Sequence, residues 1–479
     1  MERWLGPHRA SLRLVDLWNS AFARLNPAST ILFLWAALTL PLVLFRGFNG
    51  DEGLAVSIAR SALEKGDWLT PYVFNIRFAE RPTLLSWIIG LVSAPFGGVS
   101  QITARLVVAL FLLLGCFLID WLLKTLRASN SARVLGVALF LACPLVQRAY
   151  VLVTADMPLA VLLFCAFCLW WSGYSRGSLK FARWVAVGVA LALAGLLKGP
   201  QPLAYFAFGI GAFIVWHRAW NQIPGYVFAG LISAVVVFGW YWYVYSSGDE
   251  AQWAHFMRLG EGVPLRGPFK EGLQLLAETL PVALFSGLFF VSCKIPRQDR
   301  QLVELVRAIA LYSSITSIIM LFWPNGSDSR YFFPMLLPLA VLGAMAFDFM
   351  AAKRPETVAP GLVILLGLLA YCFIYSWASP FFPNQFRSSK VDAARIERVV
   401  GVEHAPIYRT GGVGLNVMPY LTGPILETSV QRLESAKGPA WVAVTVPEAA
   451  MLMQRRAGKI REVLSFGSDK EWRLLELSP

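Results

Sequence analysis

The sequence predicts an α-helical protein that crosses a membrane many times and ends in a small α/β domain. Apolar residues make up 57% of its 479 positions and charged residues 15%, against roughly 45–50% and about 25% in soluble proteins. The mean hydropathy is +0.58. So few charges cannot cover a water-facing surface of this size. Composition therefore excludes a soluble enzyme, a disordered chain and a coiled coil, whereas the polar stretch after about residue 380 predicts the terminal domain.

The first segment, residues 1–29, is basic and amphipathic. Its Trp4, Leu5 and Trp18 are interspersed with arginines such as Arg9 and Arg13. This pattern predicts a cytoplasmic helix that lies at the membrane surface. The apolar run that follows lacks a small-residue cleavage site, so we expect it to be a span and not a cleaved signal.

The membrane domain is predicted to occupy residues 30–379. A spanning helix needs about 20 mostly apolar residues, and this rule predicts about eleven spans. The eleven that can be placed lie near residues 30–46, 102–123, 134–151, 157–172, 181–197, 201–216, 224–245, 273–293, 304–323, 331–350 and 359–378. Leu84–Phe96 is too short to span and predicts a helix at the membrane surface.

The charges predict which way the spans run. The net charge is +13, and its excess sits in alternate short loops, as the positive-inside rule expects of cytoplasmic loops. We therefore read it as a topology signal and expect no nucleic-acid partner. The basic loops carry Lys124/Arg127/Arg133, Arg176/Lys180/Arg183, Arg218, Lys294/Arg297/Arg300 and Lys353/Arg354.

The opposite, non-cytoplasmic side receives the long first loop, residues 46–101, and the tail, residues 380–479. The tail alternates strand-like stretches such as APIYRT, AWVAVTV and WRLLEL with the helix-like EAAMLMQRRAG. Such alternation predicts a small α/β domain.

Unusual polar residues collect on this non-cytoplasmic side. The first loop opens with Asn49-Gly50-Asp51-Glu52 and later reads Ala79-Glu80-Arg81-Pro82. Carboxylates that emerge straight from a span lie at the rim of the hydrocarbon, where burial is costly without a role. A solvated acidic turn is the ordinary alternative for an isolated Asp-Glu pair.

Three later turns on the same side add charges. They are Thr154–Pro158 with Asp156, Lys198-Gly199-Pro200, and Asn325–Tyr331 with Arg330. Taken singly, a helix cap or a topology signal accounts for each. Taken together they predict a pocket at membrane level in which a carboxylate takes a proton from an acceptor and cations neutralise a departing lipid phosphate.

These motifs resemble those of bacterial GT-C glycosyltransferases related to aminoarabinose transferase and the protein O-mannosyltransferases, which use polyprenyl-phosphate sugars. The Asp-Glu pair, ALEKGDWLTP and AERPTLLSW carry the resemblance in the first loop. TADMP, GLLKGP and SRYFFPMLLPLAVL follow in the family's order, so that the resemblance covers roughly residues 40–345.

The resemblance implies roles for individual residues. The catalytic carboxylate maps to Asp51, with Glu52 and Asp156 as further catalytic candidates. The contacts to the donor phosphate map to Arg81, Lys198, Arg330 and Tyr331, and further candidates are Glu80, His255, Arg258 and Arg266. This chain has Arg81 where the family usually has Lys, and Ala79 where it usually has an aromatic residue. Because Arg grips phosphate with two parallel hydrogen bonds, we expect donor binding to survive the first change.

The resemblance predicts an inverting glycosyltransferase with the GT-C fold and about eleven to thirteen spans, placed in the bacterial inner membrane with its site facing the periplasm. It would move a sugar from undecaprenyl phosphate or a similar polyprenyl carrier to lipid A or another lipopolysaccharide sugar of the cell envelope. One alternative keeps the chemistry but transfers to protein hydroxyls, as protein O-mannosyltransferases do. A different class is a lipid-linked-sugar flippase or permease, which predicts polar residues in mid-span.

The sequence predicts neither a cofactor nor a metal site, and we expect a monomer. The four histidines, His8, His217, His255 and His404, are scattered along the chain. Carboxylates and water are the ligands of hard cations, so a divalent cation at the predicted pocket stays an open alternative.

Overall fold

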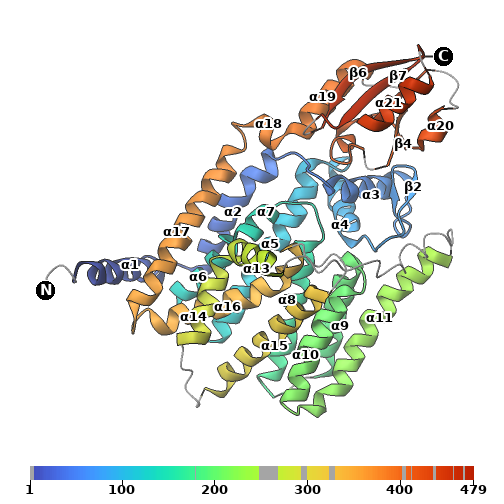
Figure 1. Ribbon diagram of the computed structural model, residues 1–479. Helices are drawn as coiled ribbons and strands as arrows, with labels where there is room; N and C mark the ends of the chain where they lie inside the picture. The colour runs from blue at the N-terminus through green and yellow to red at the C-terminus, as the bar shows by residue number, and fades with distance from the viewer. Residues whose placement is uncertain are drawn as a thin grey trace.

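A computed structural model shows a helical domain joined to a small sheet domain at the C-terminal end of the chain (Figure 1). It describes residues 5–177, 180–246, 268–292, 299–322, 329–401, 406–411, 413–434, 439–456, 458–467 and 470–478. The predicted candidates His255, Arg258 and Arg266 lie outside these residues, as does the turn 325–328.

The described residues include eight helices that are long and apolar enough to cross a membrane. The chain is therefore a multi-pass membrane protein, as its composition predicts. These helices are α2 (Pro27–Phe45), α5 (Gln101–Thr125), α8 (Asp156–Tyr174), α9 (Phe181–Lys198), α11 (Ile223–Ser246), α15 (Arg300–Phe322), α16 (Phe333–Met350) and α17 (Pro355–Ala378).

The other three predicted spans form shorter or interrupted helices. Residues 134–151 divide into α6 (Asn130–Leu141) and α7 (Pro144–Ala149), and residues 273–293 divide into α13 (Pro268–Thr279) and α14 (Val282–Ser292). Pro144 lies at the first break and Pro281 at the second. A proline interrupts a helix because its ring clashes with the carbonyl four residues earlier and it has no N–H to donate. The third, α10 (Gln201–Trp216), has 16 residues.

Two further helices lie where the sequence predicts helices at the membrane surface. Helix α1 (Leu5–Ala23) packs against α6 and α17. Its Val15 and Trp18 are buried, and the Trp18 indole donates a hydrogen bond of 3.2 Å to the carbonyl oxygen of Ser131. Part of its apolar face is thus used inside the protein. The second is α4 (Leu84–Ser93), which ends in the 3₁₀ turn η2 (Ala94–Phe96).

The first loop is a folded unit between α2 and α5. It contains α3 (Glu52–Lys65) and α4, separated by the hairpin β1 (Tyr72–Val73) and β2 (Ile76–Arg77). Helices α3 and α4 pack together, and Gly90 of α4 lets Trp68, in the segment after α3, approach, because a Cβ there would lie 2.9 Å from the indole ring.

The tail forms an α/β domain, as predicted. Its five strands lie in the order β4-β3-β5-β7-β6, parallel in the β4-β3-β5 half and antiparallel in the rest. The elements are α18 (Pro383–Phe386), α19 (Ser388–Val400), β3 (Ile407–Arg409), η5 (Met418–Tyr420), β4 (Ile425–Glu427), α20 (Val430–Glu434), β5 (Ala440–Thr445), α21 (Val446–Arg455), β6 (Ile460–Phe466) and β7 (Trp472–Leu477).

This domain docks on the start of the first loop. The Phe48 N–H donates to the Tyr420 hydroxyl at 2.8 Å, and the Phe48 carbonyl accepts from the Ser389 hydroxyl at 2.6 Å. Helix α3 approaches so closely that a Cβ on Gly53 would lie 1.6 Å from the Leu415 carbonyl oxygen. The segment that precedes Asp51 is therefore held by residues from the far end of the chain (Figure 1).

Candidate active site

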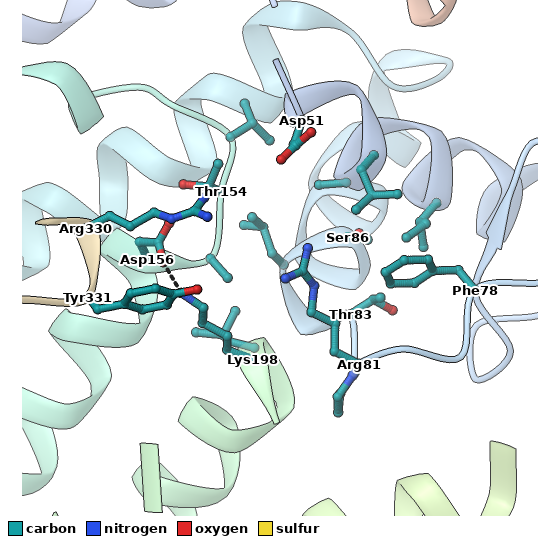
Figure 2. A pocket seen from close by; sticks show the side chains of 18 residues that line it. Asp51, Phe78, Arg81, Thr83, Ser86, Thr154, Asp156, Lys198, Arg330 and Tyr331 are labelled. Atoms are coloured by element: carbon teal, nitrogen blue, oxygen red, sulfur yellow. Dashed lines mark hydrogen bonds and ion pairs between the residues drawn. The ribbon is translucent and has the colours of Figure 1, made fainter. Parts of the chain in front are cut away.

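The structure brings six of the predicted side chains to one cavity. It lies where the first loop meets the start of α8, the end of α9 and the start of α16 (Figure 2). The six are Asp51, Arg81, Asp156, Lys198, Arg330 and Tyr331. Two carboxylates and three cations share this space, so their formal charges sum to +1 and favour an anionic ligand.

Asp51 lies immediately before α3. Its carbonyl oxygen accepts the Leu54 N–H at 3.0 Å, as in the first turn of a helix. Its side chain makes no capping hydrogen bond to that helix. The carboxylate lines the cavity and faces it in Figure 2.

Glu52 points elsewhere. Its carboxylate is fully buried and lies 3.0 Å from the guanidinium of Arg105, which is also fully buried. Its two oxygens accept the backbone N–H groups of Asn49 at 2.6 Å and Val153 at 2.8 Å. Glu52 does not line the cavity.

The Glu52–Arg105 pair joins two segments that carry acids of the cavity. Arg105 donates to the carbonyl oxygen of Gly47, just before Asp51, and to that of Val151 at 2.8 Å, just before Asp156. Removing one partner of such a buried pair leaves an uncompensated charge. The pair therefore determines where these two segments lie relative to each other.

Asp156 and Lys198 form an ion pair inside the cavity. The Lys198 ammonium donates to Asp156 Oδ1, and the two side chains are only 7% and 10% exposed, the lysine being the more exposed. Asp156 is the first residue of α8 and Lys198 the last of α9. Both positions suit the helix dipole, which favours anions at N-termini and cations at C-termini.

Tyr331 brings aromatic surface to two cations. The Lys198 Nζ lies 4.2 Å from the centre of its ring, and the Arg330 guanidinium carbon lies 5.5 Å from it. Ser329, which precedes Arg330, hydrogen-bonds to Glu278, which also pairs with Arg148 at 2.7 Å. The start of α16 is thus tied to α13 and α7.

Arg81 lines the other side of the cavity with its side chain 38% exposed. Glu80 is 3.9 Å from it, 58% exposed, and does not line the cavity. Phe78 does line it, and its ring centre lies 6.0 Å from the Arg81 guanidinium carbon. An aromatic ring is therefore present one residue before Ala79, where the family usually has its aromatic residue.

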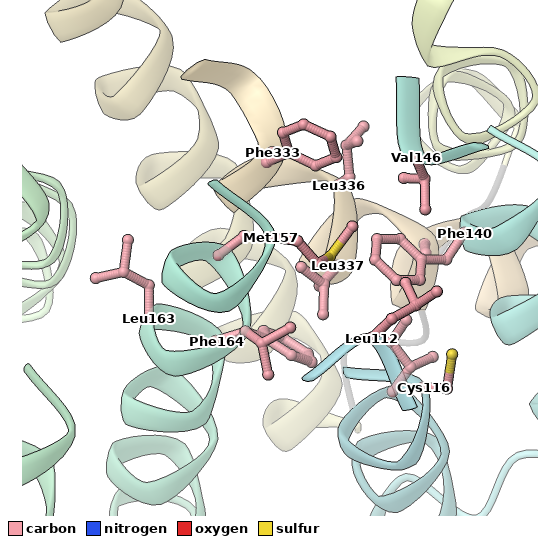
Figure 3. Packing of buried hydrophobic residues seen from close by; sticks show 14 of the residues in the cluster. Leu112, Cys116, Phe140, Val146, Met157, Leu163, Phe164, Phe333, Leu336 and Leu337 are labelled. Carbon is pink, nitrogen blue, oxygen red and sulfur yellow. The ribbon is translucent and has the colours of Figure 1, made fainter. Parts of the chain in front are cut away.

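The helices that carry the site are fixed by an apolar core. Met157 and Phe164 of α8 pack with Leu112 of α5 and Leu337 of α16, all of them buried (Figure 3). Gly115 allows the close approach, because a Cβ there would lie 3.0 Å from Val161 and 3.1 Å from Leu337. This packing leaves little freedom to the starts of α8 and α16.

Sequence reasoning missed several site residues. Thr83 and Ser86 begin α4, and together with Thr154 they add hydroxyls to the cavity. Because Thr83 and Ser86 are three residues apart at a helix start, the sequence could have indicated that the two hydroxyls share one face of the helix. Arg105 was also overlooked, although a lone charge inside a long apolar run indicates a role. Among the described residues no three His, Cys, Asp or Glu side chains lie close enough to hold a metal ion.

Comparisons of sequence agree on a set of relatives. Residues 29–259 match the family model for dolichyl-phosphate-mannose-protein mannosyltransferase. The undecaprenyl phosphate-alpha-4-amino-4-deoxy-L-arabinose arabinosyl transferase of Erwinia tasmaniensis is 24% identical over 316 residues, which are 63% of this chain and 56% of that protein. Its counterpart from an Enterobacter species is 24% identical over 354 residues, 71% of this chain and 63% of that protein. This chain thus covers less than two thirds of these curated relatives.

A comparison of structures gives a broader match. The crystal structure of ArnT from Cupriavidus metallidurans bound to undecaprenyl phosphate superimposes with a TM-score of 0.75 and 16% identity, covering 93% of this chain and 97% of that one. The apo state of the same protein gives a TM-score of 0.73. At this identity the superposition establishes a shared fold.

Proposed function

Because this chain has the GT-C fold and is a relative of the aminoarabinose transferases and protein O-mannosyltransferases, we propose that it is a membrane glycosyltransferase that takes its sugar from a polyprenyl phosphate. The observation that carries the proposal is the cavity in which Asp51 lies among Arg81, Lys198 and Arg330. The acceptor that we propose is lipid A or another lipopolysaccharide sugar, as the resemblance of the motifs implies, and the names of the curated relatives support the donor, an aminoarabinose carried on undecaprenyl phosphate.

The reaction is a single displacement with inversion. The acceptor oxygen forms a bond to the anomeric carbon while the bond from that carbon to the phosphate oxygen breaks, and its electron pair leaves with the phosphate. Arg81, Lys198 and Arg330 neutralise the charge that grows on the leaving phosphate. Asp51 takes the proton of an acceptor hydroxyl, or orients the oxygen if the acceptor is a phosphate that is already ionised.

Asp156 and Tyr331 hold Lys198 in place for this reaction. The Asp156 carboxylate binds the ammonium and the Tyr331 ring lies beside it, so that the cation is oriented before the donor arrives. Glu52 acts as a positioning residue through Arg105, whereas Glu80 lies at the rim next to Arg81. His255, Arg258 and Arg266, which lie outside the described residues, stay further candidates for the site on the resemblance alone.

The membrane is the bacterial inner membrane, and the cavity faces the periplasm. Positive-inside charges support this orientation, because every basic loop then lies in the cytoplasm. The first loop and the tail domain, which build the cavity and its surroundings, then share the opposite side.

The test uses purified protein in vesicles supplied with undecaprenyl-phosphate aminoarabinose and lipid A. We expect transfer by the wild type and a loss of at least about 100-fold in Asp51→Asn, because a general base contributes about 10²–10⁴-fold. Asp67→Asn is the matched control: Asp67 belongs to the same loop, accepts the Thr70 N–H at 3.0 Å and does not line the cavity. Wild-type transfer by Asp51→Asn would refute the assignment.

Transfer to protein is the second candidate function. The match of residues 29–259 to a protein mannosyltransferase family favours it. Mass spectrometry of lipid A and of envelope proteins from a strain that lacks the gene separates the two candidates. A lost mass on lipid A supports the first, and a lost hexose on proteins the second.

A further inference from the structure

We propose that a second cavity, on the other side of α3, binds the saccharide part of the acceptor. This inference rests on the proposed function. The cavity lies between α3, the β1–β2 hairpin and the segment Thr422–Leu426 that leads into β4. Ser57, Ser61 and Glu64 line it from α3, and Phe74 and Asn75 from the hairpin.

Two buried hydroxyls there have no hydrogen-bond partner among the described residues. Ser57 and Ser61 are four residues apart on one face of α3 and are only 6% and 5% exposed. Within the described part of the chain, neither Oγ has a partner. Buried polar side chains are nearly always hydrogen-bonded, so a pair of such hydroxyls beside a cavity indicates that a ligand supplies the partners.

The walls of the cavity are fixed in advance. Arg60 of α3 donates to the carbonyl oxygens of Pro419 at 2.5 Å and Leu421 at 3.4 Å. The Asn75 amide accepts the Glu427 N–H at 2.6 Å and donates to the Glu427 carbonyl at 3.3 Å. Each wall is thus bonded to the tail domain, which reduces the ordering that a ligand must impose.

The lining suits a polyhydroxylated ligand better than an anion. Arg60 is already engaged by two carbonyls, and the Lys65 ammonium lies 3.8 Å from the centre of the Tyr72 ring. Glu64 adds a carboxylate that repels a second anion. The serine hydroxyls, the Glu64 carboxylate and the Phe74 ring together offer the donors, acceptors and apolar surface that a sugar ring needs.

The ligand belongs to the acceptor and not to the donor. Leu54, Ala55 and Ile58 of α3 line the first cavity, whereas Ser57 and Ser61 line the second. The helix therefore stands between them, and a helix with its side chains is about 10–12 Å across. The donor sugar is bonded directly to its phosphate, so it cannot reach across α3 while the cations hold that phosphate. An acceptor made of several linked sugars is long enough to reach from the first cavity across α3 to the second.

The first test is the double variant Ser57→Ala/Ser61→Ala. Removing hydroxyls that have no protein partner among the described residues leaves the fold intact, and losing two hydrogen bonds to the acceptor raises its KM by about tenfold. We measure transfer to lipopolysaccharide that carries core sugars, and we expect kcat and the donor KM to stay at wild-type values.

Ser313→Ala is the matched control. Ser313 lies in α15, is 8% exposed, and its hydroxyl likewise has no partner within the described residues. We expect a wild-type KM. An unchanged acceptor KM in the double variant overturns the proposal.

The second test does not depend on transfer. A photoreactive benzoylphenylalanine in place of the exposed Lys65, which lines the cavity but is not among the groups assigned to the sugar, should cross-link to core-bearing lipopolysaccharide. The cross-link should weaken with Ser57→Ala/Ser61→Ala, and excess undecaprenyl phosphate should not compete. Cross-linking without any transfer by the wild type supports the cavity and refutes the proposed function. Transfer without cross-linking refutes the cavity alone, and competition by undecaprenyl phosphate assigns it to the donor.

Discussion

Replacing Glu52 by glutamine tests whether this acid positions the site or takes part in the chemistry. In the wild type, Oε1 accepts from Val153, and Oε2 accepts from Asn49 and Arg105. Glutamine has one oxygen and one NH2 group. Whichever way it turns, the NH2 group therefore faces a buried N–H donor, and the Arg105 guanidinium loses its counter-charge.

The cost follows from these contacts. One unsatisfied buried donor costs about 1–3 kcal/mol, and a hydrogen bond to a charged group contributes about 1.5–3 kcal/mol. We therefore expect Glu52→Gln to lower the free energy of unfolding by about 3–5 kcal/mol, in line with the loss of one partner from a buried ion pair. The transfer rate should fall as well, because the segments that carry Asp51 and Asp156 lose their connection.

The assay is equilibrium unfolding in mixed micelles, together with transfer by the same preparations. Glu462→Gln is the control: Glu462 pairs with Arg473 at 3.0 Å while 41% exposed, and such a surface pair is worth at most about 1 kcal/mol. In Glu52→Gln/Arg105→Gln the buried charges disappear together, so the double variant should be more stable than the sum of the single losses predicts. A Glu52→Gln protein as stable as the wild type but inactive would refute the positioning role.

Four further predictions address other contacts. Lys198→Met should reduce transfer by at least about tenfold by removing a phosphate contact, whereas Lys390→Met, in α19, should not; equal transfer by both would contradict the role of Lys198. Gly53→Ala should destabilise docking of the tail domain, since its Cβ would lie 1.6 Å from the Leu415 carbonyl oxygen. Gly230→Ala should not, because no described atom outside its own helix lies within 4 Å of a Cβ there. Limited proteolysis measures how well the docked tail domain is protected, and equal protection of the two variants would count against the clash. Burial raises the pKa of Tyr420 from 10.0 to about 12. The neutral hydroxyl therefore contributes fully to the free energy of unfolding below pH 10, and this contribution is lost as the pH rises towards 12. The free energy of unfolding of Tyr420→Phe should not show this loss, and a pH profile identical to that of the wild type would contradict the prediction. Lys459→Cys should react with an impermeant maleimide from the periplasm and Lys124→Cys should not; the reverse would invert the topology.

The fold was predictable to the extent that it depends on apolar run length. The spans of α2, α5 and α17 stand out in the sequence because each contains a long apolar run. The runs containing Pro144 and Pro281 look similar in hydropathy, yet the prolines divide them into short helices. Hydropathy scores side chains and does not register the backbone hydrogen bonds that a proline removes, and these decide whether the helix continues.

The cavity was predictable because charges are scarce on the non-cytoplasmic side, so that Asp156, Lys198 and Arg330 stand out among the apolar residues of the sequence. What sequence reasoning could not supply is the direction of each side chain. Asp51 and Glu52 are neighbours, yet the helix start turns one towards the cavity and the other towards Arg105. Spacing alone does not separate them, because the buried arginine comes from a different helix.

The contact between Phe48 and Tyr420 has a consequence for biosynthesis. Its partners are 372 positions apart, and a ribosome adding about 5–20 residues per second makes the second about 20–70 s after the first. Throughout that interval the segment before Asp51 is held by contacts to earlier residues, such as Arg105 on the Gly47 carbonyl, but not by the tail domain. A chain that stops before Tyr420 would therefore lack the hydrogen bond that the Phe48 N–H donates to the Tyr420 hydroxyl. The contacts that hold the segment before Asp51 are therefore complete only once the tail domain has been made.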